Sequence, residues 1–303
     1  MRRLLLPFLF ASFLGAQADE VIRVSWNTAH GASPPQLSRP AADFLPAFRL
    51  ALTTLPESAI VALALSQPSM LGLTPAQAGM MRPLVAERYA LIAQSPTYSS
   101  VASALPYCFA EKRPQEGLAL VHVPAGADAR TPVLVFLHGY GGSFLWYQHL
   151  LAEHFPKFVL ICPAYGINTA GIPAGYVQEC VQAVSARLGR PIVKPVLLGL
   201  SAGGTGACEV FTQHPERFDR FICIAAPPPE DLLPKFPREA KVAFISGGEE
   251  SFVKSGSFSR NIAQIRRLAP LTQEFIVPQA DHFFLLSHTA LTMAKLREWL
   301  PKL

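Results

Sequence analysis

The sequence has few charged residues and no run of basic side chains, and the apolar run at its start is too short to cross a membrane. Only 16% of the 303 residues are charged, and Lys and Arg are scattered along the chain. This distribution argues against a nucleic-acid-binding protein. Residues 4–14 are apolar, but a spanning helix needs about 20 such residues. Half of the residues are hydrophobic, so the chain can bury a large core.

The sequence also lacks the residue spacings that bind metal ions. Its cysteines have no paired close spacing, and no H-E-x-x-H pattern occurs, so we expect neither a metal nor a cofactor. Two of the cysteines lie in strand-like apolar runs and are expected to be buried thiols. Export from the cell would permit a disulfide, and the odd number of cysteines leaves at least one unpaired or shared with another chain. The five are Cys108, Cys162, Cys180, Cys208 and Cys223.

The first 18 residues have the features of an export signal. Arg2 and Arg3 precede the apolar run, and Ala16-Gln17-Ala18 is typical of a signal-peptidase cleavage site. We therefore expect residues 1–18 to be removed and the mature chain to begin near Asp19. The predicted location is secreted or periplasmic, with no membrane span after cleavage. A membrane anchor and a twin-arginine export route are the alternatives.

From about residue 105 onward, short apolar runs alternate with helix-like segments. The runs are continuously apolar, which is typical of strands covered by helices on both faces. Alternation of strands and helices predicts a mostly parallel sheet in a three-layer α/β sandwich. The connection between residues 226 and 241 leaves room only for a minimal cap, so we expect an open site. The predicted strands are 118–123, 133–137, 158–162, 196–200, 221–225, 242–245 and 275–277.

Residues 19–104 differ in texture, because they are rich in Ala, Leu and Pro. The sequence Thr74-Pro75-Ala76-Gln77 has the N-cap, the first-turn proline and the N3 glutamine of a helix start. We expect a helix from there to about Gln94, with a kink at Pro83. Residues 19–104 are predicted to form a helical N-terminal extension packed on a catalytic domain of residues 105–303. A lid or a pro-segment is the alternative for this extension.

The most informative motif is Gly199-Leu200-Ser201-Ala202-Gly203. It follows an apolar run and precedes a small-residue stretch, which is the arrangement of a nucleophile elbow between a strand and a helix. A serine hydroxyl needs a base to take its proton, and the elbow presents it where a histidine can reach it. Ser201 is therefore the candidate nucleophile.

Further segments complete a resemblance. His138-Gly139 follows a predicted strand and Asp281-His282 lies near the end of the chain. With the Ser201 motif, these make residues 105–303 resemble the α/β-hydrolase superfamily. Within it, the chain is similar to secreted serine esterases of the carboxylesterase and polyhydroxyalkanoate-depolymerase-like groups. The resemblance implies a serine hydrolase that cleaves small-molecule or polymeric carboxylic esters through an acyl-enzyme, without metal or cofactor.

The base and the acid of the predicted triad follow from the order Ser, acid, His that this superfamily requires. His282 is the candidate base, and His288 is its rival. The acid must orient the imidazole from a loop at the same sheet edge. The resemblance implies Glu250, with glutamate in place of the commoner aspartate, and Glu249 and Asp231 are the alternatives.

The oxyanion of a tetrahedral intermediate would need hydrogen-bond donors about 3 Å away. The backbone N–H of Ala202 is one candidate, and the resemblance implies the Tyr140 N–H as the other. Trp146 and Phe283 are candidates for lining a substrate pocket, with ordinary core packing as the alternative.

Two other functions fit the same residues. A serine peptidase or amidase would use the same fold and triad, because the pocket decides the substrate class. A catalytically silent protein of this fold could bind a partner through the same cleft. The natural substrate and the oligomeric state are not determined by the sequence.

Overall fold

The computed structural model describes residues 18–32, 39–71, 73–110 and 115–301. The predicted signal peptide, residues 1–18, therefore lies outside the described residues except for Ala18. Within the described ranges, no helix combines the length and the hydrophobicity needed to cross a membrane.

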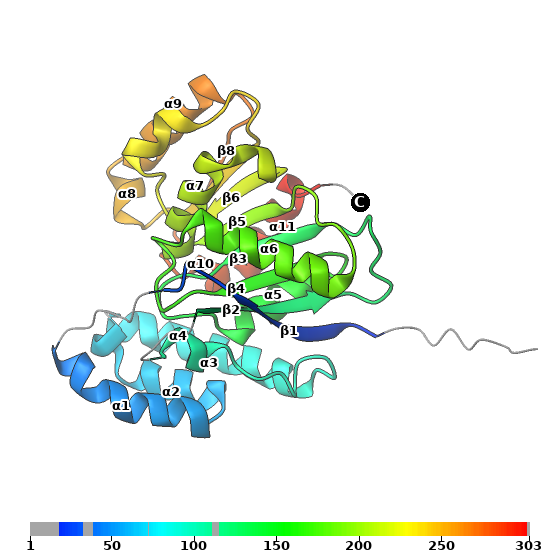
Figure 1. The fold of residues 1–303 in the computed structure, drawn as a ribbon. Coiled ribbons are helices and arrows are strands. Elements are labelled where there is room, and N and C mark those ends of the chain that lie inside the picture. The colour runs from blue at the N-terminus through cyan, green and yellow to red at the C-terminus, as the bar shows by residue number, and fades with distance from the viewer. Residues whose placement is uncertain (1–17, 33–38, 72, 111–114, 302–303) are drawn as a thin grey trace, which may run out of the picture.

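An eight-stranded sheet forms the centre of the molecule, in the order β1-β2-β4-β3-β5-β6-β7-β8 (Figure 1). β2 pairs antiparallel with both β1 and β4, and every other pairing is parallel. The strands predicted from the apolar runs are all present. Their bounds are β1 (Glu20–Asn27), β2 (Glu116–Val123), β3 (Val133–Leu137), β4 (Val159–Ala164), β5 (Val196–Leu200), β6 (Arg220–Ile224), β7 (Val242–Gly247) and β8 (Gln273–Val277).

Helices connect these strands and surround the sheet. The α-helices are α1 (Arg39–Thr54), α2 (Glu57–Ser66), α3 (Pro75–Gln94), α4 (Leu105–Cys108), α5 (Leu145–His154), α6 (Ala174–Leu188), α7 (Ala202–Gln213), α8 (Ser251–Lys254), α9 (Ser257–Leu268), α10 (Phe284–Ser287) and α11 (Thr289–Trp299). Short 3-10 helices are η1 (Pro68–Leu71), η2 (Pro215–Arg217) and η3 (Glu230–Lys235).

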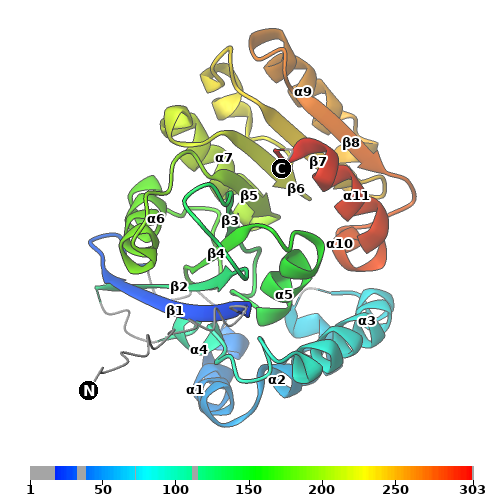
Figure 2. The same ribbon diagram turned by 90° about the vertical axis from the view of Figure 1, so that its right-hand side faces the viewer.

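The sheet separates two hydrophobic cores, as a three-layer sandwich requires. Successive side chains of a strand point to opposite faces. On β3, Leu134 and Phe136 face the core under α5, α10 and α11, whereas Val133 and Val135 face the core under α6, α7 and α9. Figure 2 shows α6 and α7 on one side of the sheet and α5, α10 and α11 on the other. The predicted three-layer α/β sandwich with a mostly parallel sheet is confirmed.

The N-terminal region is only partly helical. α3 begins as predicted, with Thr74 and Gln77 forming a reciprocal capping box, and it contains Pro83. Residues 20–27, however, form β1, which pairs along its full length with β2. The predicted helical extension thus holds for α1 to α3, whereas its first segment after the predicted cleavage site forms a strand and joins the sheet. The boundary drawn at residues 104 and 105 stays a prediction.

α1 to α4 gather beyond the β1–β2 end of the sheet, whereas α8 and α9 lie at the β8 end (Figures 1 and 2). α3 packs against both α5 and α10. Between β6 and β7 the chain forms only η3, in agreement with a minimal cap. The N-terminal region therefore contacts the sheet domain through α3.

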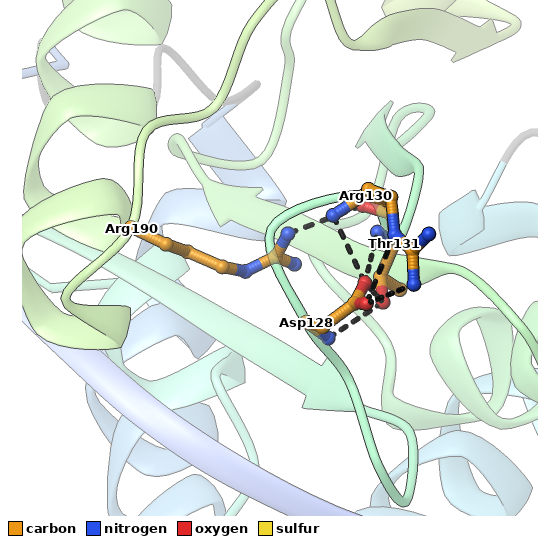
Figure 3. A network of polar contacts seen from close by, with 4 residues as sticks. All are labelled: Asp128, Arg130, Thr131 and Arg190. Carbon is orange, nitrogen blue, oxygen red and sulfur yellow. Dashed lines mark hydrogen bonds and ion pairs between the residues drawn. The ribbon is translucent and has the colours of Figure 1, made fainter.

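A polar turn fixes the start of β3 at the opposite edge from the carboxyl ends of the parallel strands (Figure 3). The Asp128 carboxylate accepts the backbone N–H groups of Arg130 and Thr131 at 2.9 and 3.0 Å. Arg190 donates to the Thr131 carbonyl at 3.2 Å, which ties the chain after α6 to this turn. Hydrogen bonds from Arg130 hold the pKa of Asp128 below its ordinary value.

The five cysteines all lie in the described part of the chain, and no disulfide joins any of them. All five side chains are buried. Burial raises the pKa of the Cys223 thiol to about 12, which makes the reactive thiolate form unfavourable. The cysteines therefore act as small hydrophobic core residues.

Candidate active site

Ser201 occupies a sharp turn between β5 and α7. Its backbone has φ 55° and ψ −120°, a conformation that a residue with a side chain adopts only under strain. The Ser201 N–H donates to the Ile224 carbonyl of β6 at 2.7 Å, which helps to hold the turn. The strained backbone is the geometry expected of a nucleophile elbow.

The two glycines of the motif are sterically required. A Cβ added to Gly199 would lie 2.1 Å from the Gly203 carbonyl oxygen. A Cβ added to Gly203 would lie 2.2 Å from the carbonyl oxygen of Leu137, at the end of β3. Both contacts involve backbone atoms that cannot move aside, so the turn, α7 and β3 approach one another only because these side chains are missing.

Ser201, His282 and Glu250 form one hydrogen-bonded chain. His282 Nε2 lies 2.9 Å from Ser201 Oγ, and His282 Nδ1 lies 2.6 Å from Glu250 Oε1. The three residues follow β5, β8 and β7. Because these strands are parallel, their carboxyl ends meet at one edge of the sheet, which is where ligands bind in open α/β sheets.

The hydrogen-bond partners assign the proton positions on the imidazole. A carboxylate only accepts, so Nδ1 donates to Glu250, and Nε2 is left to accept the proton of the Ser201 hydroxyl. The Glu250 side chain is 12% exposed and that of His282 is 35% exposed. The carboxylate is thus shielded from solvent while the histidine still faces it, and the arrangement can move a proton from serine to histidine.

The loops that carry Glu250 and His282 are tied directly to each other. The N–H groups of Gly248 and Glu249 donate to the carbonyls of Val277 and Ala280, each at 2.9 Å. The Asp281 carboxylate accepts the Phe283 N–H at 3.0 Å, so it stabilises its own loop. The partner of His282 Nδ1 is Glu250. The spacing between acid and base is therefore set by backbone contacts.

The alternative candidates lie in other environments. Glu249 forms an exposed ion pair with Lys254 at 2.5 Å. The Asp231 side chain is 78% exposed and lies 3.9 Å from the Lys235 ammonium. His288 contacts the neighbouring Ser287 hydroxyl. The structure brings none of these three side chains into hydrogen-bonding contact with Ser201 or His282.

The loop after β3 passes beside the nucleophile. A Cβ added to Gly139 would lie 3.3 Å from Ser201 Cβ. His138 is 1% exposed and its Nε2 accepts the Tyr165 N–H at 3.4 Å, which leaves Nδ1 to donate to the Gly139 carbonyl at 2.8 Å. His138 therefore braces the start of this loop.

The proposed oxyanion donors are the N–H groups of Tyr140 and Ala202. In the described part of the chain, neither N–H has a protein acceptor, whereas the Gly141 N–H donates to the Ile167 carbonyl at 2.7 Å. Ala202 is the first residue of α7, and the N-terminus of a helix favours negative charge. Both groups are thus available to an oxyanion.

The aromatic residues proposed for the pocket divide into two groups. Phe283 is half-buried beside the triad, with its ring centroid 5.5 Å from that of His282. Trp146 is 6% exposed, packs against Tyr147 at 3.9 Å and belongs to the core beneath α5. This burial agrees with the alternative of ordinary core packing for Trp146, and its place in a pocket stays a prediction.

Glu57, which sequence analysis did not single out, contacts the start of α5, directly after the loop that follows β3. Its side chain is buried and accepts the Leu145 N–H at 2.7 Å. Burial raises the pKa of the Glu57 carboxyl, although hydrogen bonds from its neighbours oppose this shift. The only signal in the sequence is a single acidic residue at the head of the apolar segment that forms α2.

Residues 132–247 match the family model for the alpha/beta hydrolase fold. This range runs from the start of β3 to the end of β7 and includes the Ser201 turn. The chain has the α/β-hydrolase fold. A crystal structure of dienelactone hydrolase from Anabaena variabilis ATCC 29413 aligns with a TM-score of 0.50 at 17% identity, over 61% of this chain and 93% of that one. The match supports the predicted superfamily for residues 132–247.

Two curated proteins are similar over a shorter stretch. Both are pimeloyl-[acyl-carrier protein] methyl ester esterases, from Pectobacterium carotovorum subsp. carotovorum (strain PC1) and Klebsiella pneumoniae (strain 342). Each is 33% identical to this α/β-hydrolase-fold chain, over 98 and 99 residues. The matches span 31% of this chain and only 37% of each relative. They do not single out the polyhydroxyalkanoate-depolymerase-like group.

Proposed function

We propose that this protein is an exported serine hydrolase that cleaves carboxylic esters through an acyl-enzyme intermediate. The observation that carries the proposal is the hydrogen-bonded chain from Glu250 through His282 to Ser201, set on a strained turn at the carboxyl edge of the sheet. This is the arrangement in which a serine hydroxyl is activated by a base that is itself oriented by an acid.

In the proposed mechanism, Ser201 Oγ attacks the ester carbonyl while His282 Nε2 takes its proton. The oxyanion that forms is stabilised by the N–H groups of Tyr140 and Ala202. His282 then gives the proton to the leaving alcohol, and the acyl group stays on Ser201. A water molecule, deprotonated by the same histidine, releases the acid and restores the serine.

One comparison supports an ester as the substrate, and the exposure of the site bears on the size of that ester. The partial relatives are named as methyl ester esterases. The site is also open, since Tyr140 is 57% exposed and the His282 side chain is 35% exposed. An open site of this kind can accept either a small ester or the end of a polymer.

The test is hydrolysis of nitrophenyl esters of increasing acyl length by the mature protein from Asp19, beside its Ser201→Ala variant. We expect turnover by the wild type alone, and the chain length with the highest kcat/KM will size the acyl pocket. Removing the nucleophile should cost about 10⁶-fold in kcat. Equal turnover by both forms would contradict the serine mechanism.

Two further assays separate the alternatives. A peptidase or amidase would cleave peptide anilides with a higher kcat/KM than the short esters. A catalytically silent protein would turn over neither substrate and would not react with a fluorophosphonate. Export is tested separately, by sequencing the N-terminus of the protein recovered outside the cytoplasm, where we expect Asp19.

A further inference from the structure

The buried Glu57 carboxylate collects hydrogen bonds from three separate parts of the chain. It lies in the first turn of α2 and is 8% exposed. Oε1 accepts the Tyr89 hydroxyl of α3 at 2.7 Å and the Leu145 N–H of α5 at 2.7 Å, while Oε2 contacts the Ser103 hydroxyl. A buried carboxylate is costly unless its oxygens are satisfied, so this acid serves as a junction between the N-terminal helices and α5.

Glu57 acts as the missing N-cap of α5. The residue at the N-cap position, Phe144, has no side-chain acceptor, although the first N–H groups of a helix need one. Glu57 supplies that acceptor from another helix, and its negative charge faces the positive end of the α5 dipole. The position where α5 starts therefore depends on Glu57.

The start of α5 is also the end of the loop that carries the proposed oxyanion donor. Leu145 lies five residues after Tyr140 in the chain. α4 contacts the same stretch, since a Cβ added to Gly142 would lie 2.9 Å from the Leu105 side chain. Phe144 packs on the small core formed by Leu52, Ile60 and Leu105.

The two ends of this loop are thus held by different parts of the molecule. His138 fixes its beginning within the sheet domain, and Glu57 fixes its end from the N-terminal helices. Tyr140 lies between these two anchors, beside the Gly141 N–H that donates to the Ile167 carbonyl at 2.7 Å, and we expect release of either end to shift it. A displacement of about 1 Å in such a group can cost about 100-fold in rate.

We propose that Glu57 is a positioning residue for the oxyanion hole. By accepting the Leu145 N–H, Glu57 holds the loop that carries the Tyr140 N–H in place. This inference rests on the proposed function, because it assigns a role in the same reaction. It also gives the N-terminal helices a purpose: they complete the frame of the active site.

A matched pair of variants at residue 145 tests the loss of the hydrogen bond, with the proline Cδ taking the place of the hydrogen that faces Glu57 Oε1. Proline lacks the N–H but fits the first position of a helix, and Phe144 already has the extended backbone, φ −77° and ψ 139°, that precedes a proline. Leu145→Ala removes the same side chain and keeps the N–H, so it is the baseline. We expect Leu145→Pro to have a kcat roughly 10- to 100-fold below that of Leu145→Ala, with KM little changed.

A second pair tests the carboxylate itself. Glu57→Gln keeps an oxygen that can accept the Leu145 N–H, whereas Glu57→Leu fills the space without any acceptor. We expect kcat to fall in Glu57→Leu and to be largely retained in Glu57→Gln. Inhibition by a boronic acid, which places an oxygen in the oxyanion hole, should weaken in the same variants and by a similar factor.

Rates are divided by the concentration of sites titrated with a fluorophosphonate, so that partial unfolding does not count as lost kcat. Equal kcat values within both pairs would overturn the proposal, since a purely structural Glu57 would change only the number of folded molecules. If one member of a pair does not fold, the other pair decides. A different result, turnover retained by Ser201→Ala, would contradict the proposed function itself.

Discussion

Replacing Glu250 by Gln should lower kcat by roughly 10⁴-fold while the fold is kept. Glu250 Oε1 lies 2.6 Å from His282 Nδ1 and accepts a hydrogen bond from its N–H. A glutamine at this position can turn its NH₂ group toward Nδ1, which favours the tautomer with the proton on Nε2. That nitrogen then cannot accept the proton of Ser201, which lies 2.9 Å away.

The size of this effect follows from the surroundings of the acid. A factor of about 10⁴ corresponds to roughly 5.4 kcal/mol of activation free energy. Solvent would weaken the interaction of an exposed carboxylate, but the Glu250 side chain is only 12% exposed. Its bond to the imidazole is short and charge-assisted, so we expect nearly the full loss.

The neighbouring residue provides a matched control. Glu249 carries the same side chain one position earlier and forms an ion pair with Lys254, whose side chain is 58% exposed. Glu249→Gln removes that exposed pair, which contributes at most about 1 kcal/mol to stability. We therefore expect kcat to stay close to that of the wild type.

The assay is the steady-state kcat of each variant on the nitrophenyl ester that the wild type cleaves best. Thermal unfolding of each variant confirms that it is folded. If Glu250→Gln retained kcat within tenfold of the wild type, or if both substitutions caused equal mild losses, the assignment of the acid would be refuted and Asp231 would be examined next.

Three further predictions concern stability. Gly203→Ala should lower the free energy of unfolding by about 1–3 kcal/mol in a urea titration, because its Cβ would lie 2.2 Å from the Leu137 carbonyl oxygen; an unchanged midpoint would mean that the turn relaxes freely. Burial opposes ionisation of Asp219, but hydrogen bonds from Lys241 and Arg220 outweigh this effect and lower the pKa of Asp219 below 3.8. The ionised Asp219 carboxylate therefore stabilises the fold above pH 3.8, and this stabilisation is lost as the pH falls through the lowered pKa. Asp219→Asn should therefore be less stable than the wild type at neutral pH, with the difference vanishing in acid, and a difference independent of pH would contradict this. A reducing agent should leave the unfolding temperature unchanged, because the five cysteines are buried thiols; a lower temperature would reveal a disulfide.

The sheet was predictable because its strands are buried on both faces. Continuous apolar runs such as residues 133–137 and 196–200 predict central parallel strands, and both are present as β3 and β5. β1 was missed because it is an edge strand, and its sequence EVIRVSWN mixes exposed and buried residues. Such a pattern lacks the continuous apolar run by which the central strands were predicted. Its pairing with β2 depends on residues about 95 positions away in the chain, such as Trp26 opposite Gly117, which local patterns do not report.

The candidate site was predictable as far as residue order determines it. The elbow around Ser201 and the late position of His282 are visible in the sequence. The choice between Glu249 and Glu250 is not, because adjacent residues differ only in the direction in which the loop turns them. That direction is set by backbone bonds to Ala280 and Val277. Glu57 was also invisible, since its partners lie on three different elements.

The most direct test of the account is to treat the mature protein with a fluorophosphonate and locate the adduct by peptide mapping. We predict one adduct on the peptide that contains Ser201, absent from Ser201→Ala and formed far more slowly in His282→Ala. This result would show that Ser201 is a nucleophile activated by His282. An unlabelled wild type, or an adduct on another residue, would contradict the central claim.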